Sequence, residues 1–247
     1  MSGHQHGPHV HTGRHFDEIA GEYNDSLAPA VVAHYLERRV ALLESLVPPP
    51  GPVLDAGCGT GILLWSLAQR GYRVAGIDPS VGMLRQTPAE TPAALVQGSA
   101  GDLPFADASF PLVVSVATFH HLVSPALVAA AVREMLRVTV PGGATVVWDH
   151  NPRNPYWPLL MARVPQDQEP TRLIPQREIT AAIAGDPSLQ VDCGYRGWVP
   201  DFAPAWSLPL LGVVERALEA IPGVRTFSAH NVVVIRKGWS DQSAASH

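Results

Sequence analysis

The sequence contains little lysine and no long apolar run. Lys237 is the only lysine among 17 basic residues in a chain of 247 residues with a formal net charge of -5. Because the basic residues are scattered, the chain offers no basic surface for a phosphate backbone, and nucleic acid is not expected as a partner. The longest apolar runs, such as Leu208 to Val214, are far shorter than the roughly 20 residues that cross a bilayer, which excludes stable membrane insertion.

Cysteine is equally scarce, with only Cys58 and Cys193. Two cysteines cannot form a disulfide framework, and this favours a reducing compartment. Histidines are frequent near the N-terminus, at His4, His6, His9, His11 and His15. They are irregularly spaced and no apolar stretch accompanies them, so the sequence predicts neither a secretory signal nor a metal site, and we expect a cytoplasmic protein.

With 46% hydrophobic and 16% charged residues, the chain has the composition of a globular protein. We predict a single domain over residues 16–237, between a flexible histidine-containing head (1–15) and a flexible tail (238–247). Within the domain, the sequence predicts an N-terminal helical cap (16–50), a ligand-binding core (51–150) and an acceptor-side region (151–237) that contains an insertion (200–225).

Short apolar runs alternate with amphipathic segments along most of the chain. The predicted strands are Pro52 to Ala56, Arg73 to Ile77, Ala94 to Gln97, Leu112 to Thr118, Ala144 to Trp148, Gln190 to Val199 and His230 to Arg236. This pattern predicts a Rossmann-like, doubly wound α/β fold with a mostly parallel seven-stranded sheet. The helical periodicity of Phe16 to Asn24, Ala30 to Val47 and Trp206 to Ile221 predicts helices that could form a lid over the strand ends.

The strongest local signal is the segment Asp55 to Gly61, which reads D-A-G-C-G-T-G after the first strand. Its third glycine comes one residue too early for a dinucleotide-binding fingerprint, which leaves a NAD-dependent oxidoreductase as the less favoured alternative. Asp55 at the mouth of the turn would repel a pyrophosphate and would attract an ammonium group. Asp78, at the end of the next strand, can accept hydrogen bonds from both hydroxyls of a ribose, so a nucleoside is expected.

Further motifs follow in order along the chain. They are G-I-D-P-S at Gly76 to Ser80, D-L-P-F at Asp102 to Phe105, F-H-H-L at Phe119 to Leu122, and L-R with P-G-G at Leu136 to Gly143. Together with the glycine turn, they resemble the class I S-adenosylmethionine-dependent methyltransferases, particularly the small-molecule branch that includes the quinone-biosynthesis C-methyltransferases. The resemblance covers roughly Phe16 to Trp148.

This resemblance implies S-adenosylmethionine as the cofactor and S-adenosylhomocysteine as the product. It implies that Asp55 and the glycine turn hold the methionine portion, and that Pro79 and Met83 line the adenine pocket. The implied cofactor-binding residues are Tyr23, Asp55, Ala56, Gly57, Cys58, Gly59, Gly61, Asp78, Pro79, Met83, Ser99, Ala100 and Ala117.

The chain departs from the family pattern at Ser99 and Pro111. Relatives commonly place an aspartate at the first position to bind the adenine amino group, whereas Ser99 offers a hydroxyl and Ala100 a backbone amide. Pro111 follows Ser109 and Phe110 where the family usually has a Ser-Phe-Asp triplet, so it replaces the aspartate and affects the entry to a strand. The first departure keeps open a catalytically silent sensor or scaffold that binds the cofactor without turnover.

Methyl transfer needs a base only for acceptors such as a phenol, an alcohol or an acidic carbon. His121 is the first candidate and His120 the second, with a structural role as the alternative for both. Asp149 and His150 follow the fifth strand and could orient an acceptor, or they could belong to a loop fixed by Asn and Pro.

The acceptor itself is expected to be a small metabolite methylated at oxygen, nitrogen or carbon. Tyr156, Trp157 and Trp206 could form an aromatic wall for it, or they could pack the lid helix. Aromatic, sugar and lipid-linked acceptors remain open, the last because Leu208 to Val214 could form an apolar surface. The sequence does not determine the oligomeric state.

Overall fold

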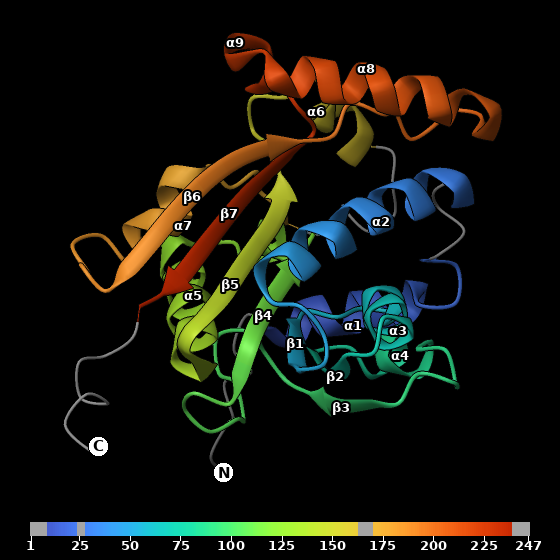
Figure 1. Cartoon of the computed structure of the whole chain (residues 1–247). Coiled ribbons are helices and arrows are strands. Elements are labelled where there is room, and N and C mark those ends of the chain that lie inside the picture. The colour runs from blue at the N-terminus through green and yellow to red at the C-terminus, as the bar shows by residue number, and fades with distance from the viewer. Residues whose placement is uncertain (1–8, 24–27, 163–169, 239–247) are drawn as a thin grey trace.

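The computed structural model describes residues 9–23, 28–162 and 170–238 (Figure 1). The strands are β1 (Pro52–Ala56), β2 (Arg73–Asp78), β3 (Ala93–Gln97), β4 (Phe110–Val116), β5 (Thr139–His150), β6 (Leu189–Arg196) and β7 (His230–Lys237). The helices are α1 (His9–Ile19), α2 (Pro29–Leu46), α3 (Ile62–Gln69), α4 (Val81–Arg85), α5 (Pro125–Val138), α6 (Trp157–Met161), α7 (Gln176–Ala181), α8 (Leu208–Ala220) and α9 (Pro222–Arg225). Two 3-10 helices are η2 (Phe119–His121) and η4 (Ala205–Ser207).

The strands form one sheet in the order β3-β2-β1-β4-β5-β7-β6. Neighbouring strands from β3 to β5 run parallel, whereas β7 pairs antiparallel with both β5 and β6. This confirms the predicted doubly wound, mostly parallel seven-stranded sheet. The chain proceeds outward from β1 to β3 and then returns to β4 on the other side of β1, so the carboxyl ends of β1 and β4 flank the switch point where such folds bind ligands.

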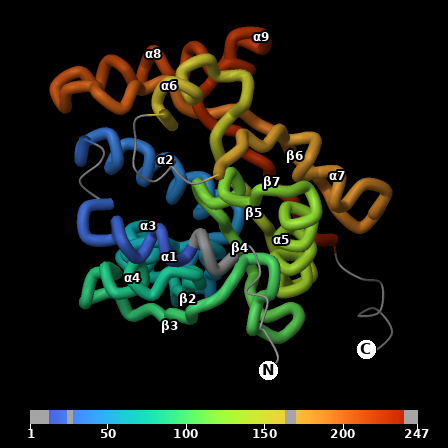
Figure 2. The backbone as a smooth tube through the Cα atoms, turned by 180° about the vertical axis from the view of Figure 1, so that it is seen from behind, coloured from blue at the N-terminus to red at the C-terminus, as the bar shows by residue number. Residues whose placement is uncertain are grey.

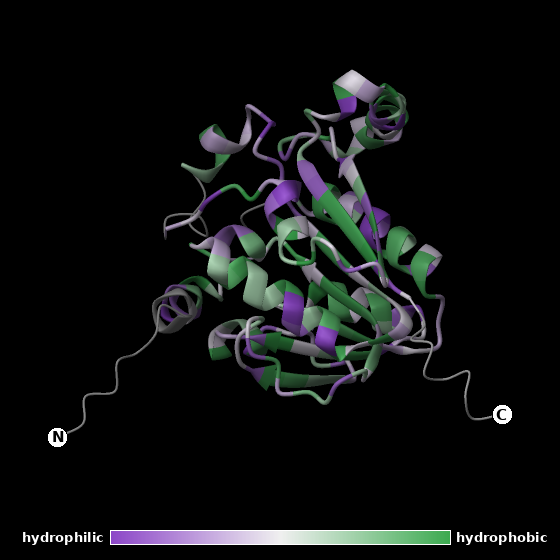
Figure 3. Ribbon diagram, turned by 90° about the vertical axis from the view of Figure 1, so that its left-hand side faces the viewer, coloured by the Kyte–Doolittle hydropathy of each residue, from purple (hydrophilic) through white to green (hydrophobic). Residues whose placement is uncertain are grey.

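Each face of the sheet is covered by helices and has its own apolar cluster. Leu54 belongs to the cluster that includes α5 and α7, whereas its neighbour Val53 belongs to the cluster that includes α2 and α3. Figure 3 shows the resulting hydrophobic strands between two helical layers. Because both faces are buried, the strands read as continuous apolar runs, which explains why the sequence identifies them.

Local sequence features set several element boundaries. Ser124 caps α5 by accepting a hydrogen bond from the Leu127 amide at 3.3 Å, and Pro125 occupies the first turn, where no amide donor is needed. β5 begins at Thr139 and not at the predicted Ala144, because Thr139 pairs with Phe110 before a register shift. Pro141, Gly142 and Gly143 lie within this strand, although proline and glycine are unfavourable in strand interiors.

The N-terminal boundary also differs from the prediction. Helix α1 begins at His9, within the segment 1–15 for which we expected a flexible head, and ends at Ile19. Residues 1–8 and most of the predicted tail, 239–247, lie outside the described residues.

The predicted insertion before the last strand contains α8 and the short α9. Figures 1 and 2 show α8 along one end of the molecule, beside α2 and beyond the carboxyl end of β5. Leu208 and Leu211 pack against Val31 and Tyr35 of α2. Among the described residues, no helix combines the length and the hydropathy that a membrane span requires.

Candidate functional site

The glycine turn between β1 and α3 requires glycine for steric reasons. Gly57 has a φ of +86°, and a Cβ at this position would lie 2.3 Å from Oγ1 of Thr118. Gly61 is also left-handed, with a φ of +71°, and it caps the N-terminus of α3. The turn therefore brings bare backbone to the carboxyl end of β1, where a ligand can approach it closely.

Asp55 lies in β1 just before this turn and is 2% exposed. Its Oδ1 has no hydrogen-bond partner among the described residues. Burial raises the pKa of Asp55 well above its ordinary value, Asp78 raises it further, and Arg39 opposes both effects. A buried carboxylate with an unused acceptor is costly, and an ammonium group would satisfy it.

Arg39 is a cation near Asp55 that the sequence did not single out. It extends from α2 over the ring of Trp148, with its guanidinium carbon 5.8 Å from the ring centroid, and its buried Nε has no hydrogen-bond partner among the described residues. Burial lowers the pKa of Arg39, although the nearby Asp55 raises it, and no ion pair within 4.0 Å joins the two residues. The sequence pattern could have identified Arg39, because it interrupts the apolar stripe of its helix three residues after Leu36 and four before Leu43.

Asp78 closes the other side of the turn. One carboxylate oxygen accepts a hydrogen bond from the amide of Gly59 and the other from the amide of Ser80, both at 2.9 Å. Burial raises the pKa of Asp78, and these two amides oppose the effect. The carboxylate is therefore fixed beside the glycine turn, as a ribose-binding group requires.

Helix α1 covers the ends of β2 and β3. Oδ1 of Asp17 accepts hydrogen bonds from the Ser80 hydroxyl and the Gly82 amide, both at 2.6 Å. A cavity of about 440 Å³ opens there. The residues that line it are Gly13, Arg14, Asp17, Pro79, Gln97, Gly98 and Ser99. Pro79 and Ser99, both predicted for the adenine pocket, are thus brought together.

Several of the other residues predicted to bind the cofactor are buried. Met83, Ala100, Ala56 and Cys58 are buried, the first at 1% exposure. Ala117 adopts a left-handed φ of 52°, a strained conformation that often marks a functional backbone position. Tyr23 packs edge-on against Phe16 of α1, with ring centroids 6.2 Å apart.

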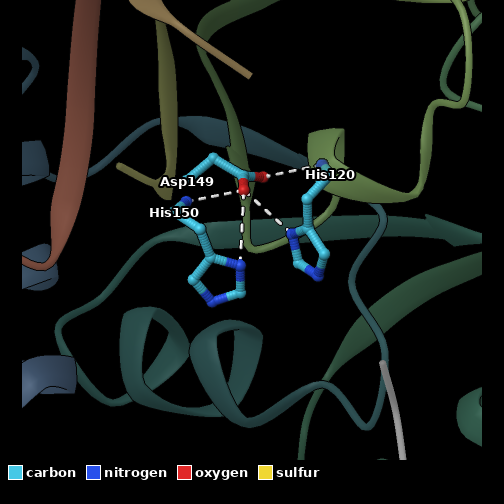
Figure 4. Close-up of side chains that lie close together, drawn as sticks. All are labelled: His120, Asp149 and His150. Carbon is cyan, nitrogen blue, oxygen red and sulfur yellow. Dashed lines mark hydrogen bonds and ion pairs between the residues drawn. The ribbon is translucent and has the colours of Figure 1, made fainter. Parts of the chain in front are cut away.

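A buried histidine–aspartate pair joins η2, which follows β4, to the last residues of β5 (Figure 4). Nδ1 of His120 is 2.8 Å from Oδ1 of Asp149. Oδ2 of Asp149 accepts a hydrogen bond from the Phe119 amide at 2.7 Å, and Oδ1 accepts one from the His150 amide at 2.6 Å. Burial alone would raise the pKa of Asp149, but His120 and His150 hold it below its usual range. The carboxylate therefore stays ionised and orients the His120 ring.

The two candidate bases lie in different surroundings. Among the described residues, His121 has no carboxylate in hydrogen-bond contact and no partner for its buried Nδ1, and its ring packs edge-on against Phe16 at 5.0 Å. Burial and His120 lower the pKa of His121 well below its ordinary value. The His150 ring packs at a tilt between His120 and Trp157, with centroid distances of 4.1 Å and 3.6 Å.

His120, Asp149 and His150 also form a candidate metal cluster among the described residues, because one ligand atom of each lies within 4.8 Å of the others. Both oxygens of Asp149 already accept hydrogen bonds from N–H groups, and its contact with His120 has an ordinary hydrogen-bond length. This arrangement favours a hydrogen-bonded pair over a metal centre.

The predicted aromatic wall is only partly assembled. Trp157 donates its indole N–H to the Ala229 carbonyl and covers His150, whereas Tyr156 donates its hydroxyl to Asp201 at 2.6 Å. Trp206, the third residue predicted for this wall, is 83% exposed, and its part in the wall stays a prediction.

Comparison with known proteins gives consistent matches over the core. Residues 54–147 match a family model described as a methyltransferase domain. A demethylmenaquinone methyltransferase of Beutenbergia cavernae is 41% identical over 144 residues, which cover 57% of this chain and 58% of that protein. A 2-methyl-6-phytyl-1,4-hydroquinone methyltransferase of Synechocystis sp. is 31% identical over 161 residues, which cover 60% of this chain and 46% of that protein. The matched region thus spans about half the length of these curated relatives.

The solved structures agree with this assignment at the level of the fold. A structure from Thermotoga maritima described as a SAM-dependent methyltransferase matches with a TM-score of 0.64 and 19% identity, covering 92% of this chain and 100% of that chain. At this identity the likeness shows the shared fold alone.

Proposed function

We propose that the chain is a class I S-adenosylmethionine-dependent methyltransferase that transfers a methyl group from S-adenosylmethionine to a small-molecule acceptor. The match of residues 54–147 to a family model described as a methyltransferase domain supports this proposal. When bound, the sulfonium of the cofactor supplies an electrophilic methyl group. The protein's part is to bind the two reactants, align them and exclude water.

The observation that carries this proposal is the pair of opposite charges beside the glycine turn. The cofactor's methionine portion has an ammonium and a carboxylate, and Asp55 with its unused Oδ1 and Arg39 without an ion pair complement them. Asp78 would accept hydrogen bonds from the ribose hydroxyls. Pro79 and Ser99, in the cavity below α1, would contact the adenine.

Calorimetric titration with S-adenosylhomocysteine, 5′-methylthioadenosine and NAD tests this assignment. We expect micromolar binding of S-adenosylhomocysteine, weaker binding of 5′-methylthioadenosine, which lacks the amino-acid portion, and none of NAD. Binding of NAD in place of the adenosyl ligands would contradict the proposal and would favour an oxidoreductase.

His120 is proposed as the general base for an acceptor that must lose a proton. Asp149 accepts from Nδ1 of His120 and so selects the tautomer in which Nε2 is the proton acceptor of the ring. Since η2 follows β4 at the switch point, Nε2 of His120 can receive the acceptor's proton while Asp149 stabilises the resulting imidazolium.

The names of the relatives indicate the acceptor class. Those of Beutenbergia cavernae and Synechocystis sp. are methyltransferases of a demethylmenaquinone and a phytyl hydroquinone. We propose a hydroquinone-type acceptor, whose acidic hydroxyl suits a His120 base. A methyl-transfer assay with labelled cofactor and short-chain hydroquinones tests this: turnover that requires a ring hydroxyl supports it, and turnover only on amines would contradict it.

A further inference from the structure

Helix α8 buries acidic side chains and exposes apolar ones, which is the reverse of an ordinary surface helix. Its Glu215 is fully buried and faces α2, where it accepts a hydrogen bond from His34 at 2.7 Å and pairs with Arg38. Glu219 also faces inward, where Arg38 and the Gly197 amide donate to it at 2.9 Å and 2.8 Å. The acidic side chains of α8 are thus satisfied inside the protein.

The opposite side of the helix is apolar and exposed. Leu210, Val213 and Val214 are 68%, 55% and 43% exposed, and Trp206, one turn before Leu210, is 83% exposed. Leu210 lies four residues after Trp206, and Val213 and Val214 lie three and four residues after Leu210. The four residues therefore share one stripe, which we call the α8 outer face. Phe202 (73% exposed) extends it before the helix, and Ile221 and Phe227 are also exposed after it.

The charges beside this face are exclusively cationic among the described residues from 202 to 227. Arg216 and Arg225 are exposed, and neither forms an ion pair within 4.0 Å with another described residue, whereas Glu215 and Glu219 point inward. An exposed stripe of Trp, Leu and Val flanked by unpaired arginines is the pattern of a helix that lies in a membrane interface.

We propose that the α8 outer face binds the surface of an anionic lipid bilayer, with Arg216 and Arg225 at the headgroups and the apolar side chains among the upper acyl carbons. A second copy of the chain fits the face less well, because a symmetric pairing would bring its arginines together without an acidic partner. The proposal goes beyond methyl transfer and does not depend on it.

Co-sedimentation of the full chain with vesicles tests the proposal. We expect binding to vesicles of equimolar phosphatidylcholine and phosphatidylglycerol, weaker binding to pure phosphatidylcholine, and a decrease with added salt. Val213→Glu should lower the partition coefficient by about tenfold or more, since burying one valine contributes roughly 1.5 kcal/mol. Arg216→Gln should weaken binding to the anionic vesicles and leave binding to phosphatidylcholine unchanged.

Val191→Glu is the matched control, because Val191 is 43% exposed on the edge strand β6 and receives the same change in charge. It should bind vesicles like the parent chain. Absence of vesicle binding by the parent chain, or equal losses in Val191→Glu and Val213→Glu, would overturn the proposal. So would a dimer, measured by sedimentation in the absence of lipid, that Val213→Glu dissociates, because the face would then belong to a second copy.

Discussion

Nδ1 of His120 lies 2.8 Å from Oδ1 of Asp149, although 29 residues separate them along the chain. The contact forms because β4 and β5 are parallel neighbours, so η2 after β4 and the last residues of β5 meet at the same edge of the sheet. Buried carboxylate and imidazole then orient each other, and in the function proposed above the remaining ring nitrogen of His120 is the proton acceptor.

We expect His120→Ala to lower kcat by about 100-fold or more while the affinity for S-adenosylhomocysteine stays within about twofold, because the base acts on the acceptor and not on the cofactor. Steady-state kinetics with a hydroquinone acceptor and calorimetry on the same preparation measure the two quantities. His121→Ala is the control for His120. Its kcat should fall less, since His121 has no carboxylate partner.

Asp149→Asn separates positioning from packing, because the amide fills the same space but cannot hold His120 by an ionised oxygen. We expect kcat to fall and the pH dependence of kcat to change, because the variant loses the negative charge that stabilises an imidazolium. Unchanged kcat and pH profile would show that Asp149 serves the fold alone.

Arg39→Met should weaken S-adenosylhomocysteine binding by about tenfold or more and leave 5′-methylthioadenosine binding unchanged. The reason is that only the first ligand carries a carboxylate for the guanidinium, and a charge-assisted hydrogen bond contributes roughly 1.5 to 3 kcal/mol. Calorimetry with both ligands gives the comparison. Equal losses for the two ligands would mean that Arg39 supports the pocket without contacting the amino-acid portion.

The strand order class and the position of the glycine turn could be predicted from the sequence, because both depend on local patterns along the chain. Asp55, Asp78 and the glycine turn follow strands whose apolar pattern is unambiguous, so their convergence could be expected. The partner of Asp149 could not be predicted. His120 and His121 are adjacent in the 3-10 helix η2, and only the conformation of that helix decides which of the two rings faces Asp149. The orientation of the apolar stripe of α8 could not be predicted for a related reason: periodicity shows that a helix has such a stripe, but it does not say that the stripe faces outward when a buried Glu215 occupies the inner side.

His230 provides a pH prediction. Burial, followed by Arg39, lowers its pKa from 6.5 to about 3 in the folded chain. Between these values the unfolded chain binds a proton that the folded chain does not, so the free energy of unfolding should fall as the pH falls from about 6.5 toward 3. One such group contributes about 1.4 kcal/mol per pH unit. Urea unfolding at several pH values should therefore give a slope that is shallower by about this amount in His230→Gln, and identical slopes would contradict the assignment.

Glu215→Gln should destabilise the fold by about 3 kcal/mol or more, because it leaves Arg38 and His34 at a buried contact without the carboxylate that faces them. The Trp198 amide donates to Glu215 at 2.7 Å, and the side-chain oxygen of the glutamine can still accept this hydrogen bond. The loss of stability therefore comes mainly from the lost negative charge. Glu37→Gln is the matched control, since Glu37 pairs with Arg70 from the same helix α2, but its side chain is 64% exposed. Such a surface pair contributes roughly 0 to 1 kcal/mol, and the control should unfold at nearly the parent's urea concentration. Similar losses in the two variants would mean that the buried network does not hold α8 against α2, and the inward orientation of its acidic residues would then need another cause.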